Sequence, residues 1–276
     1  YKQYAKIELL SYLISAALTI FFLLKYNIDG VLIAIAVTPL IQVAVMLIIF
    51  LKVLREYIQF SKLYFSTPLA NSLLAFTLMS FVSTILLNYI EIDIRALLAD
   101  QMTEADAGIW TAMTNISKNY MVFSISIFSL YVLPKFASIH TSHGFKKELL
   151  TIYKTLLPIF GIGMLLVYFF RDYVILIIYP DFNGMEPLFK WQLMGDFIRL
   201  ASVVLAHQFL AKKLVRNFIF TEILSLALFY GFARYFITMY GVEGIVIAHF
   251  IRYIIYFLVV FYLVIRYFKK IKKPVN

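Results

Sequence analysis

The sequence predicts an all-α membrane protein with several spans, and its composition and apolar patterning are the observations that predict it. Of its 276 residues, 63% are hydrophobic and 14% are charged, with a mean hydropathy of +0.88. A soluble domain has roughly 45–50% apolar and about 25% charged residues. Apolar runs long enough for a helix to cross a bilayer, roughly 18 residues or more, recur along the sequence. The alternating segments of about ten residues that form a membrane β-barrel are absent.

Eight apolar stretches are expected to be spans, and Pro residues mark several of their ends and bends. Pro68 opens the third stretch, where its missing N–H has no helical partner to lose. Pro134 is expected to end the fourth, and kinks are expected near Pro39 and Pro158, because Pro removes a helical hydrogen bond. The apolar segment 173–179 is too short to cross and is expected at the membrane surface. The predicted spans are 7–24, 31–51, 69–92, 107–133, 152–170, 187–211, 217–239 and 244–267.

A polar linker, residues 52–68, separates two predicted spans before it from six after it. Because many transporters consist of two similar halves, we expect residues 69–268 to form a complete six-helix lobe. Residues 1–51 would then be the last two helices of an earlier lobe, and residues 269–276 a basic cytoplasmic tail. The chain starts at Tyr1 rather than Met, and we expect it to be part of a longer protein.

Basic residues alternate between the two sides of this predicted layout. Most of the 25 Lys and Arg residues fall before the first span, in the linker, around Lys135, around Lys212 or in the tail. By the positive-inside rule, these segments and both ends of the chain are expected to be cytoplasmic. The opposite side is acidic, and its longest connection is expected to be a short acidic loop at 93–106. The net charge of +10 therefore indicates topology rather than nucleic-acid binding.

Three predicted spans carry charged residues near their middle. At about 1.5 Å per residue, these residues lie roughly 12–18 Å from the outer ends of their helices. The hydrocarbon core is about 30 Å thick, so the charges reach one level near its midplane. Charge is costly in lipid, and such residues are expected to face other helices or a water-filled cavity. They are Lys118, Asp196, Arg199 and Arg252.

Each of these charges continues a polar helix face in steps of three or four residues. Three cations against one carboxylate predict a cationic cavity with a net charge of +2, which would attract a diphosphate. The alternative is a set of structural ion pairs, above all Asp196 with Arg199. The polar neighbours expected in the same cavity are Asn115 beside Lys118, Gln192 beside Asp196, and Tyr256 beside Arg252.

Asp196, Glu222 and His249 are candidates for proton exchange, since buried carboxylates and His can titrate under physiological conditions. Glu222 lies about one turn into its span, so it could instead face interfacial water, and His249 could simply be hydrogen-bonded. The sequence contains no nucleotide-binding or hydrolase motif. It also lacks Cys, which excludes thiol catalysis and thiolate metal sites. These features favour a transporter over an enzyme, with no cofactor and no metal.

Four short motifs resemble a known family in their order and spacing. They are Trp191-Gln192-Leu193-Met194-Gly195-Asp196 followed by Arg199, Ala107-Gly108-Ile109-Trp110, Ser129-Leu130-Tyr131-Val132-Leu133-Pro134, and Phe169-Phe170-Arg171-Asp172. Over nearly the whole chain, the sequence resembles the Wzx-type polysaccharide flippases of the MATE-like MOP superfamily. It is most similar to the flippases for O-antigen units and for enterobacterial common antigen.

This resemblance implies twelve spans in two six-helix lobes around a central cavity, of which eight would be present here. It implies alternating access that carries an undecaprenyl-pyrophosphate-linked oligosaccharide from the cytoplasmic to the periplasmic leaflet of the bacterial inner membrane. The cargo would serve polysaccharide and lipopolysaccharide biosynthesis. Membrane lipids, a polysaccharide polymerase and chain-length proteins would be the other partners, and nucleic acid would not.

Two alternatives remain open at the level of the sequence. A MATE-type, ion-coupled exporter of small molecules would share the fold, but an acidic cavity would be expected for cationic cargo. A membrane glycan polymerase or ligase would be expected to have a large outer loop with functional Arg or His residues, and the outer loops predicted here are short.

Overall fold

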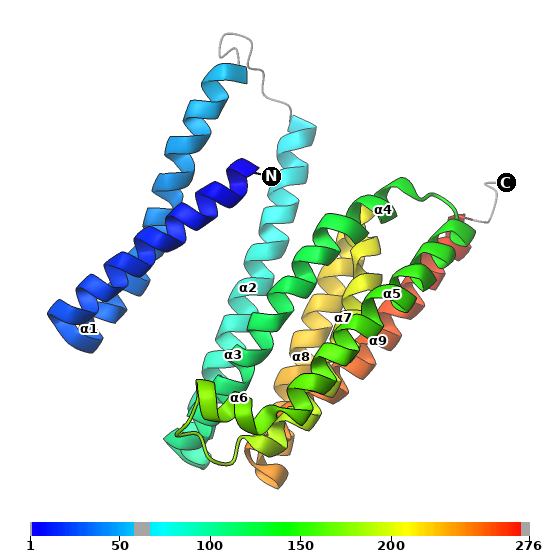
Figure 1. Ribbon diagram of the computed structural model, residues 1–276. Coiled ribbons are helices and arrows are strands. Elements are labelled where there is room, and N and C mark those ends of the chain that lie inside the picture. The colour runs from blue at the N-terminus through cyan, green and yellow to red at the C-terminus, as the bar shows by residue number, and fades with distance from the viewer. Residues whose placement is uncertain (1, 58–66, 272–276) are drawn as a thin grey trace. The chain divides into compact units, whose positions relative to one another are not determined.

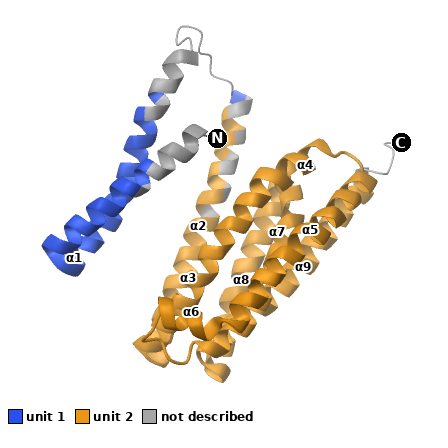
Figure 2. Cartoon of the chain, viewed as in Figure 1, with its two compact units in different colours: residues 1–67 blue, residues 68–276 orange. Residues whose placement is uncertain are grey.

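The computed structural model describes residues 2–57 and 67–271, and every element in this part of the chain is a helix (Figure 1). The chain divides into two compact units, residues 1–67 and residues 68–276 (Figure 2). The predicted linker at 52–68 is helical as far as Tyr57, and its residues 58–66 lie outside the described residues. The predicted tail begins as helix, and its residues 272–276 lie outside the described residues as well.

In the first unit, α1 (Lys2–Tyr57) consists of two helices joined at Asn27. Asn27 has φ 53° and ψ −135°, and Asn adopts positive φ more readily than most residues. Gly30 allows the close approach of the two halves, because a Cβ there would lie 2.0 Å from the carbonyl oxygen of Phe22. The joint falls in the connection expected between the first two spans. Pro39 lies inside the second half, and the kink expected there stays a prediction.

The second unit contains six long helices in the described part of the chain, joined by three short elements. α7 lies in its interior: it packs most extensively on α9, and also on α5, α4 and α3, while α8 packs on α9. The long helices are α2 (Thr67–Gln101), α3 (Glu104–Ile127), α5 (Ser142–Phe169), α7 (Glu186–Ala211), α8 (Val215–Tyr240) and α9 (Val242–Ile271). The short elements are the π-helix η2 (Phe128–Val132), α4 (Leu133–Ser138) and α6 (Arg171–Ile178).

Apolar side chains fill the interior of this unit and also cover much of its outside. Phe128, Phe189 and Phe209 are fully buried, whereas Phe123 is 72% exposed and Ile177 is 78% exposed. A soluble protein rarely exposes so much contiguous apolar surface. Among the described residues, six helical segments are long and apolar enough to cross a membrane. The chain is therefore a multi-span helical membrane protein, while the total of eight spans stays a prediction.

The prediction of an acidic loop at 93–106 is wrong. α2 continues through Asp93 and Asp100 to Gln101, and α3 already begins at Glu104. Only Met102 and Thr103 connect the two helices, and the Thr103 hydroxyl accepts a hydrogen bond from the Asp106 N–H at 3.1 Å. This N-cap explains the early start of α3. The acidic residues had suggested a loop, but charged side chains are compatible with a helix end that projects from the bilayer.

Two further bounds differ from the prediction. α5 begins at Ser142, capped by Thr141, so the basic residues placed in a loop around 146–154 lie on its first turns. The fourth span does not end at Pro134, which instead lies in α4 directly after the π-helix. In that π-helix the Leu133 N–H donates to the Phe128 carbonyl, five residues earlier. The wider turn accommodates a Pro that would disrupt an ordinary α-helical turn.

Candidate functional site

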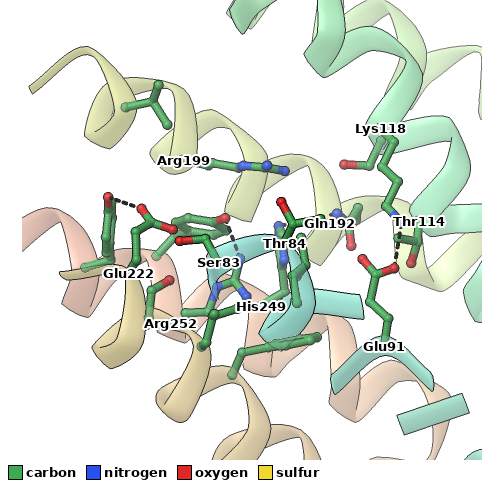
Figure 3. Close-up of a pocket in the computed structure, with 18 of the residues that line it drawn as sticks. Ser83, Thr84, Glu91, Thr114, Lys118, Gln192, Arg199, Glu222, His249 and Arg252 are labelled. Carbon is green, nitrogen blue, oxygen red and sulfur yellow. Dashed lines mark hydrogen bonds and ion pairs between the residues drawn. The ribbon is translucent and has the colours of Figure 1, made fainter. Parts of the chain in front are cut away.

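A cavity of about 330 Å³ lies among five helices of the second unit (Figure 3). Each helix contributes polar side chains to its wall, so the cavity is a polar space inside an otherwise apolar bundle. α2 supplies Ser83, Thr84, Leu87 and Glu91; α3 supplies Trp110, Thr114, Ser117 and Lys118; α7 supplies Gln192, Arg199 and Val203; α8 supplies Glu222, Ser225, Leu226 and Phe229; and α9 supplies His249, Arg252, Tyr253 and Tyr256.

Asp196 lies directly behind the cavity wall, fully buried, and links three helices. Its carboxylate accepts hydrogen bonds from α3, α7 and α9. Gly195 permits this arrangement, because a Cβ there would lie 2.5 Å from Cδ2 of the His249 ring. The donors are Ser117 Oγ at 2.5 Å, His249 Nε2 at 2.9 Å, Gln192 Nε2 at 3.1 Å and the Tyr120 hydroxyl. A carboxylate with four donors is well accommodated despite its burial.

Two arginines contact aromatic rings at the cavity rather than carboxylates. The guanidinium of Arg252, which is 6% exposed, lies 4.7 Å from the ring centroid of Phe229 and 4.2 Å from that of Tyr253. Arg252 also donates to the Tyr253 hydroxyl, and its Nε has no partner among the described residues. Arg199 lies 5.6 Å from the same Tyr253 ring. Within the described residues, neither guanidinium forms an ion pair. Cation–π contacts stabilise a cation without neutralising it, so both charges are available to an anion.

Two further pairs lie at opposite ends of the cavity, as Figure 3 shows. Lys118 Nζ lies 2.7 Å from Glu91 Oε2, and the Tyr256 hydroxyl donates to Glu222 Oε1 at 3.1 Å. Glu222, for which the sequence left both proton exchange and contact with interfacial water open, lines this cavity.

Seven of the residues expected in or near the cavity do gather around it, and Asn115 does not. Asn115 lines a separate hollow together with Thr111. The sequence had suggested that Asn115 lies beside Lys118 on one polar face, whereas the cavity face of α3 is formed by Trp110, Thr114, Ser117 and Lys118. A shift of one residue turns a side chain by about 100° around a helix, which explains the error. The seven are Lys118, Gln192, Arg199, Glu222, His249, Arg252 and Tyr256.

Sequence reasoning missed several residues that the structure brings to this site. Glu91 had a detectable signal, because it is a charged residue within an apolar stretch and follows Thr84 by seven residues, about two helical turns, on one face of α2. Ser117 and Tyr120 had none, since an uncharged hydroxyl in a span is common and only the fold brings both to Asp196.

The predicted net charge of +2 is also wrong. The three cations face two carboxylates on the cavity wall, Glu91 and Glu222, with Asp196 behind it. The ion pair of Asp196 with Arg199, which the sequence offered as an alternative, does not occur among the described residues, where Asp196 bonds to His249 instead. The cavity is therefore of mixed charge. Each carboxylate has another partner, and among the described residues neither Arg199 nor Arg252 forms an ion pair.

The fold and the cavity define a class: a multi-span, all-helical membrane protein with a polar, mixed-charge cavity inside one helical unit. Two curated relatives are similar to the chain, the lipid III flippases of Escherichia coli (strain K12) and of Shigella flexneri. Each is 30% identical over 230 residues. These alignments cover 83% of this chain and 55% of each relative, so the chain spans about half the length of the curated relatives it matches.

No family model matches the chain, and no solved structure matches it. Together with the apolar helices, the similarity to the two flippases indicates a multi-pass protein of the inner membrane. The narrower assignment to the Wzx type stays an expectation from the motifs.

Proposed function

We propose that this chain is part of a flippase that carries a lipid-linked oligosaccharide from the cytoplasmic to the periplasmic leaflet by alternating access. The observation that carries this proposal is the pair of guanidiniums, Arg199 and Arg252, which face one cavity without a carboxylate partner among the described residues. The similarity to two lipid III flippases supports the same function.

The chemistry of the two arginines suits a diphosphate. Each guanidinium offers a planar fork of donors that matches phosphate oxygens. A pyrophosphate that leaves water loses much of its solvation, and fixed cations in a low-dielectric cavity compensate for that loss. An undecaprenyl-pyrophosphate-linked unit would place its diphosphate here while its lipid tail stays in the bilayer. The unit would be an O-antigen repeat or that of enterobacterial common antigen.

The carboxylates would balance the site when it is empty. Glu222 is held by Tyr256, and Asp196 by His249 and three other donors, so neither needs an arginine. Proton exchange at Asp196, Glu222 or His249 would couple the empty and loaded states to the proton gradient. Ser83, Thr84 and Gln192 would hydrogen-bond to the sugar next to the diphosphate.

The wider arrangement belongs to the same proposal. Residues 69–268 would be a complete six-helix lobe of a MATE-like fold, and residues 1–51 the last two helices of the other lobe. Both ends of this chain would be cytoplasmic. A polysaccharide polymerase and chain-length proteins would act on the product, and membrane lipids would surround the apolar surface.

A second candidate function is an ion-coupled exporter of small molecules, and the carboxylates on the cavity wall favour it. Glu91 and Glu222 give a cationic cargo two anionic contacts. Glu91 already forms an ion pair with Lys118, however, and the two arginines would repel a cationic cargo.

Complementation tests the proposal. The full-length gene that contains this chain is introduced into strains that lack a polysaccharide flippase, and the surface glycan that returns is scored. We expect the return of one glycan. The flippase proposal is wrong if the protein reaches the membrane, no glycan returns in any strain, and an exporter-deficient strain regains resistance to cationic drugs.

A further inference from the structure

A second hollow, of about 450 Å³, lies beside α3 in the second unit. It is formed by α2, α3 and the segment between α6 and α7. On α3 it follows one face in three- and four-residue steps, from Glu104 through Gly108 and Thr111 to Asn115. Small residues make room along this face. Asn115 therefore lines this hollow rather than the cavity of the two arginines.

Two aromatic rings border this hollow. The rings of Tyr179 and Phe182 have centroids 5.3 Å apart and planes at 61°. The Phe182 N–H donates to the Tyr179 carbonyl at 3.0 Å, which fixes the turn that carries both rings. Phe182 lies against Gly108, because a Cβ at Gly108 would be 3.3 Å from Cε1 of the Phe182 ring. A glycine at position 108 thus lets the ring lie close to the helix.

The polar groups of the hollow are those that recognise sugars. Arg95 supplies a planar set of donors, Glu104 supplies acceptors, and Asn115 supplies both, and all three are exposed. Sugar hydroxyls donate and accept, while the C–H faces of a sugar ring pack against aromatic rings. A lipid chain would leave these charged groups without partners, so the chemistry favours a saccharide.

The hollow shares two of its helices, α2 and α3, with the cavity of the two arginines. Glu91 lines the cavity, and Arg95, one helical turn further along α2, lines the hollow. That four-residue step covers about 6 Å along the helix axis. On α3, the faces with Thr114 and Asn115 lie next to each other. The cavity and the hollow are thus neighbours along the same two helices.

We infer that this hollow is a saccharide subsite, which binds sugars of the cargo beyond the one attached to the diphosphate. The inference rests on the proposed function, in which the diphosphate binds near Arg199 and Arg252. The cavity of about 330 Å³ is small for an oligosaccharide, and a second subsite would extend the contacts to its outer sugars.

The test compares two cargoes in liposomes that contain the full-length protein. One is an undecaprenyl-pyrophosphate-linked monosaccharide and the other carries a complete oligosaccharide. Tyr179→Ala with Phe182→Ala removes both rings, Arg95→Gln removes the guanidinium, and Gly108→Leu displaces Phe182. Tyr173→Ala, which removes a 64% exposed ring on the adjacent α6, is the matched control.

We expect each hollow variant to lower the flipping rate of the oligosaccharide cargo at subsaturating concentration about tenfold, and the control variant to leave it unchanged. The rate for the monosaccharide cargo should stay at the wild-type level in all variants, which also shows that they fold. Equal rates of wild type and hollow variants on the oligosaccharide would overturn the inference while leaving the flippase function intact. Failure of the wild type on both cargoes would instead overturn the proposed function, and the inference with it.

Discussion

Arg252 shows how a positive charge is kept inside an apolar bundle without an ion pair among the described residues. Its guanidinium contacts the rings of Phe229 and Tyr253 and donates to the Tyr253 hydroxyl. The rings contribute an electrostatic attraction that does not cancel the charge. A carboxylate in an ion pair would have neutralised the guanidinium, whereas the aromatic contacts leave its charge available to an anionic ligand.

Replacing Arg252 with Ala should therefore lower transport of a diphosphate-linked cargo at least about tenfold, because a charge-assisted contact to phosphate is lost. Arg252→Lys keeps the charge but lacks the planar fork, and an intermediate rate is expected. The measurement is flipping in liposomes, with the amount of membrane-inserted protein as reference. Arg266→Ala, an exposed arginine on the same helix, is the control. Wild-type rates for Arg252→Ala would contradict a role for this residue in cargo binding.

Asp196, in contrast to Arg252, is surrounded by hydrogen-bonding partners: it is fully buried and accepts from four donors. Asp196→Asn places an NH₂ group where only acceptors fit, and should lower the free energy of unfolding by about 1–3 kcal/mol. Thermal unfolding in detergent measures the change. Asp172→Asn, whose side chain is 69% exposed, should leave the midpoint unchanged. A pH profile of transport that stays the same in Asp196→Asn would exclude proton exchange at this residue.

At the scale of elements, the contact of α7 with α9 positions the site, and Gly195 allows that contact. A Cβ at this position would lie 2.5 Å from His249 Cδ2 and 3.1 Å from the Phe250 Cα. Gly195→Leu should therefore separate the two helices and lower the free energy of unfolding by about 1–3 kcal/mol. Gly163→Leu on α5 is a matched control, because nothing lies within 4 Å of a Cβ there. Equal unfolding midpoints for both variants would show that the two helices are not closely packed.

The helices were largely predictable from the sequence, because apolar length is a strong local signal. α7 and α8 begin and end within two residues of their expected bounds. The misplaced ends, at Gln101 and Ser142, are those where charged residues continue a helix beyond the apolar part. Hydropathy records only the apolar part, and an N-cap such as Thr103 or Thr141 is a weaker signal.

The site was predictable only in part, for a different reason. Charges in spans were conspicuous, so Arg199 and Arg252 were expected to line a cavity, and they do. The partners of Lys118 and Asp196 could not be assigned from the sequence, because only tertiary packing brings Glu91 to Lys118 and Ser117 to Asp196. The position of Asn115 depended on the rotation of one helix, which steps of three and four residues do not fix to within one residue.

At the scale of the whole molecule, charged residues occur in two settings. Those at the cavity have individual partners, whereas those outside the predicted spans cluster in basic segments. Inside, each carboxylate at the cavity has its own partner: Lys118 for Glu91, Tyr256 for Glu222 and His249 for Asp196. In the part of the chain that the structure describes, the arginines thus form no ion pair, although the total charge of the cavity is close to balanced. An ion-coupled exporter of cations would be expected to leave a carboxylate unpaired instead, so the pairing pattern favours the proposed function more than the net charge does.

Outside the membrane, the alternation of basic segments predicts the orientation of the chain, and cysteine labelling can test it. The chain contains no Cys, so single cysteines can be introduced after any Cys elsewhere in the full-length protein is replaced. Lys213→Cys, between α7 and α8, should react with a membrane-impermeant maleimide only after the inner membrane is opened. Asp181→Cys, between α6 and α7, should react in intact spheroplasts. Both positions are exposed, so a difference in labelling reports the side of the membrane. Labelling of Lys213→Cys but not of Asp181→Cys in intact spheroplasts would show the opposite orientation. It would also contradict the proposed direction of transport.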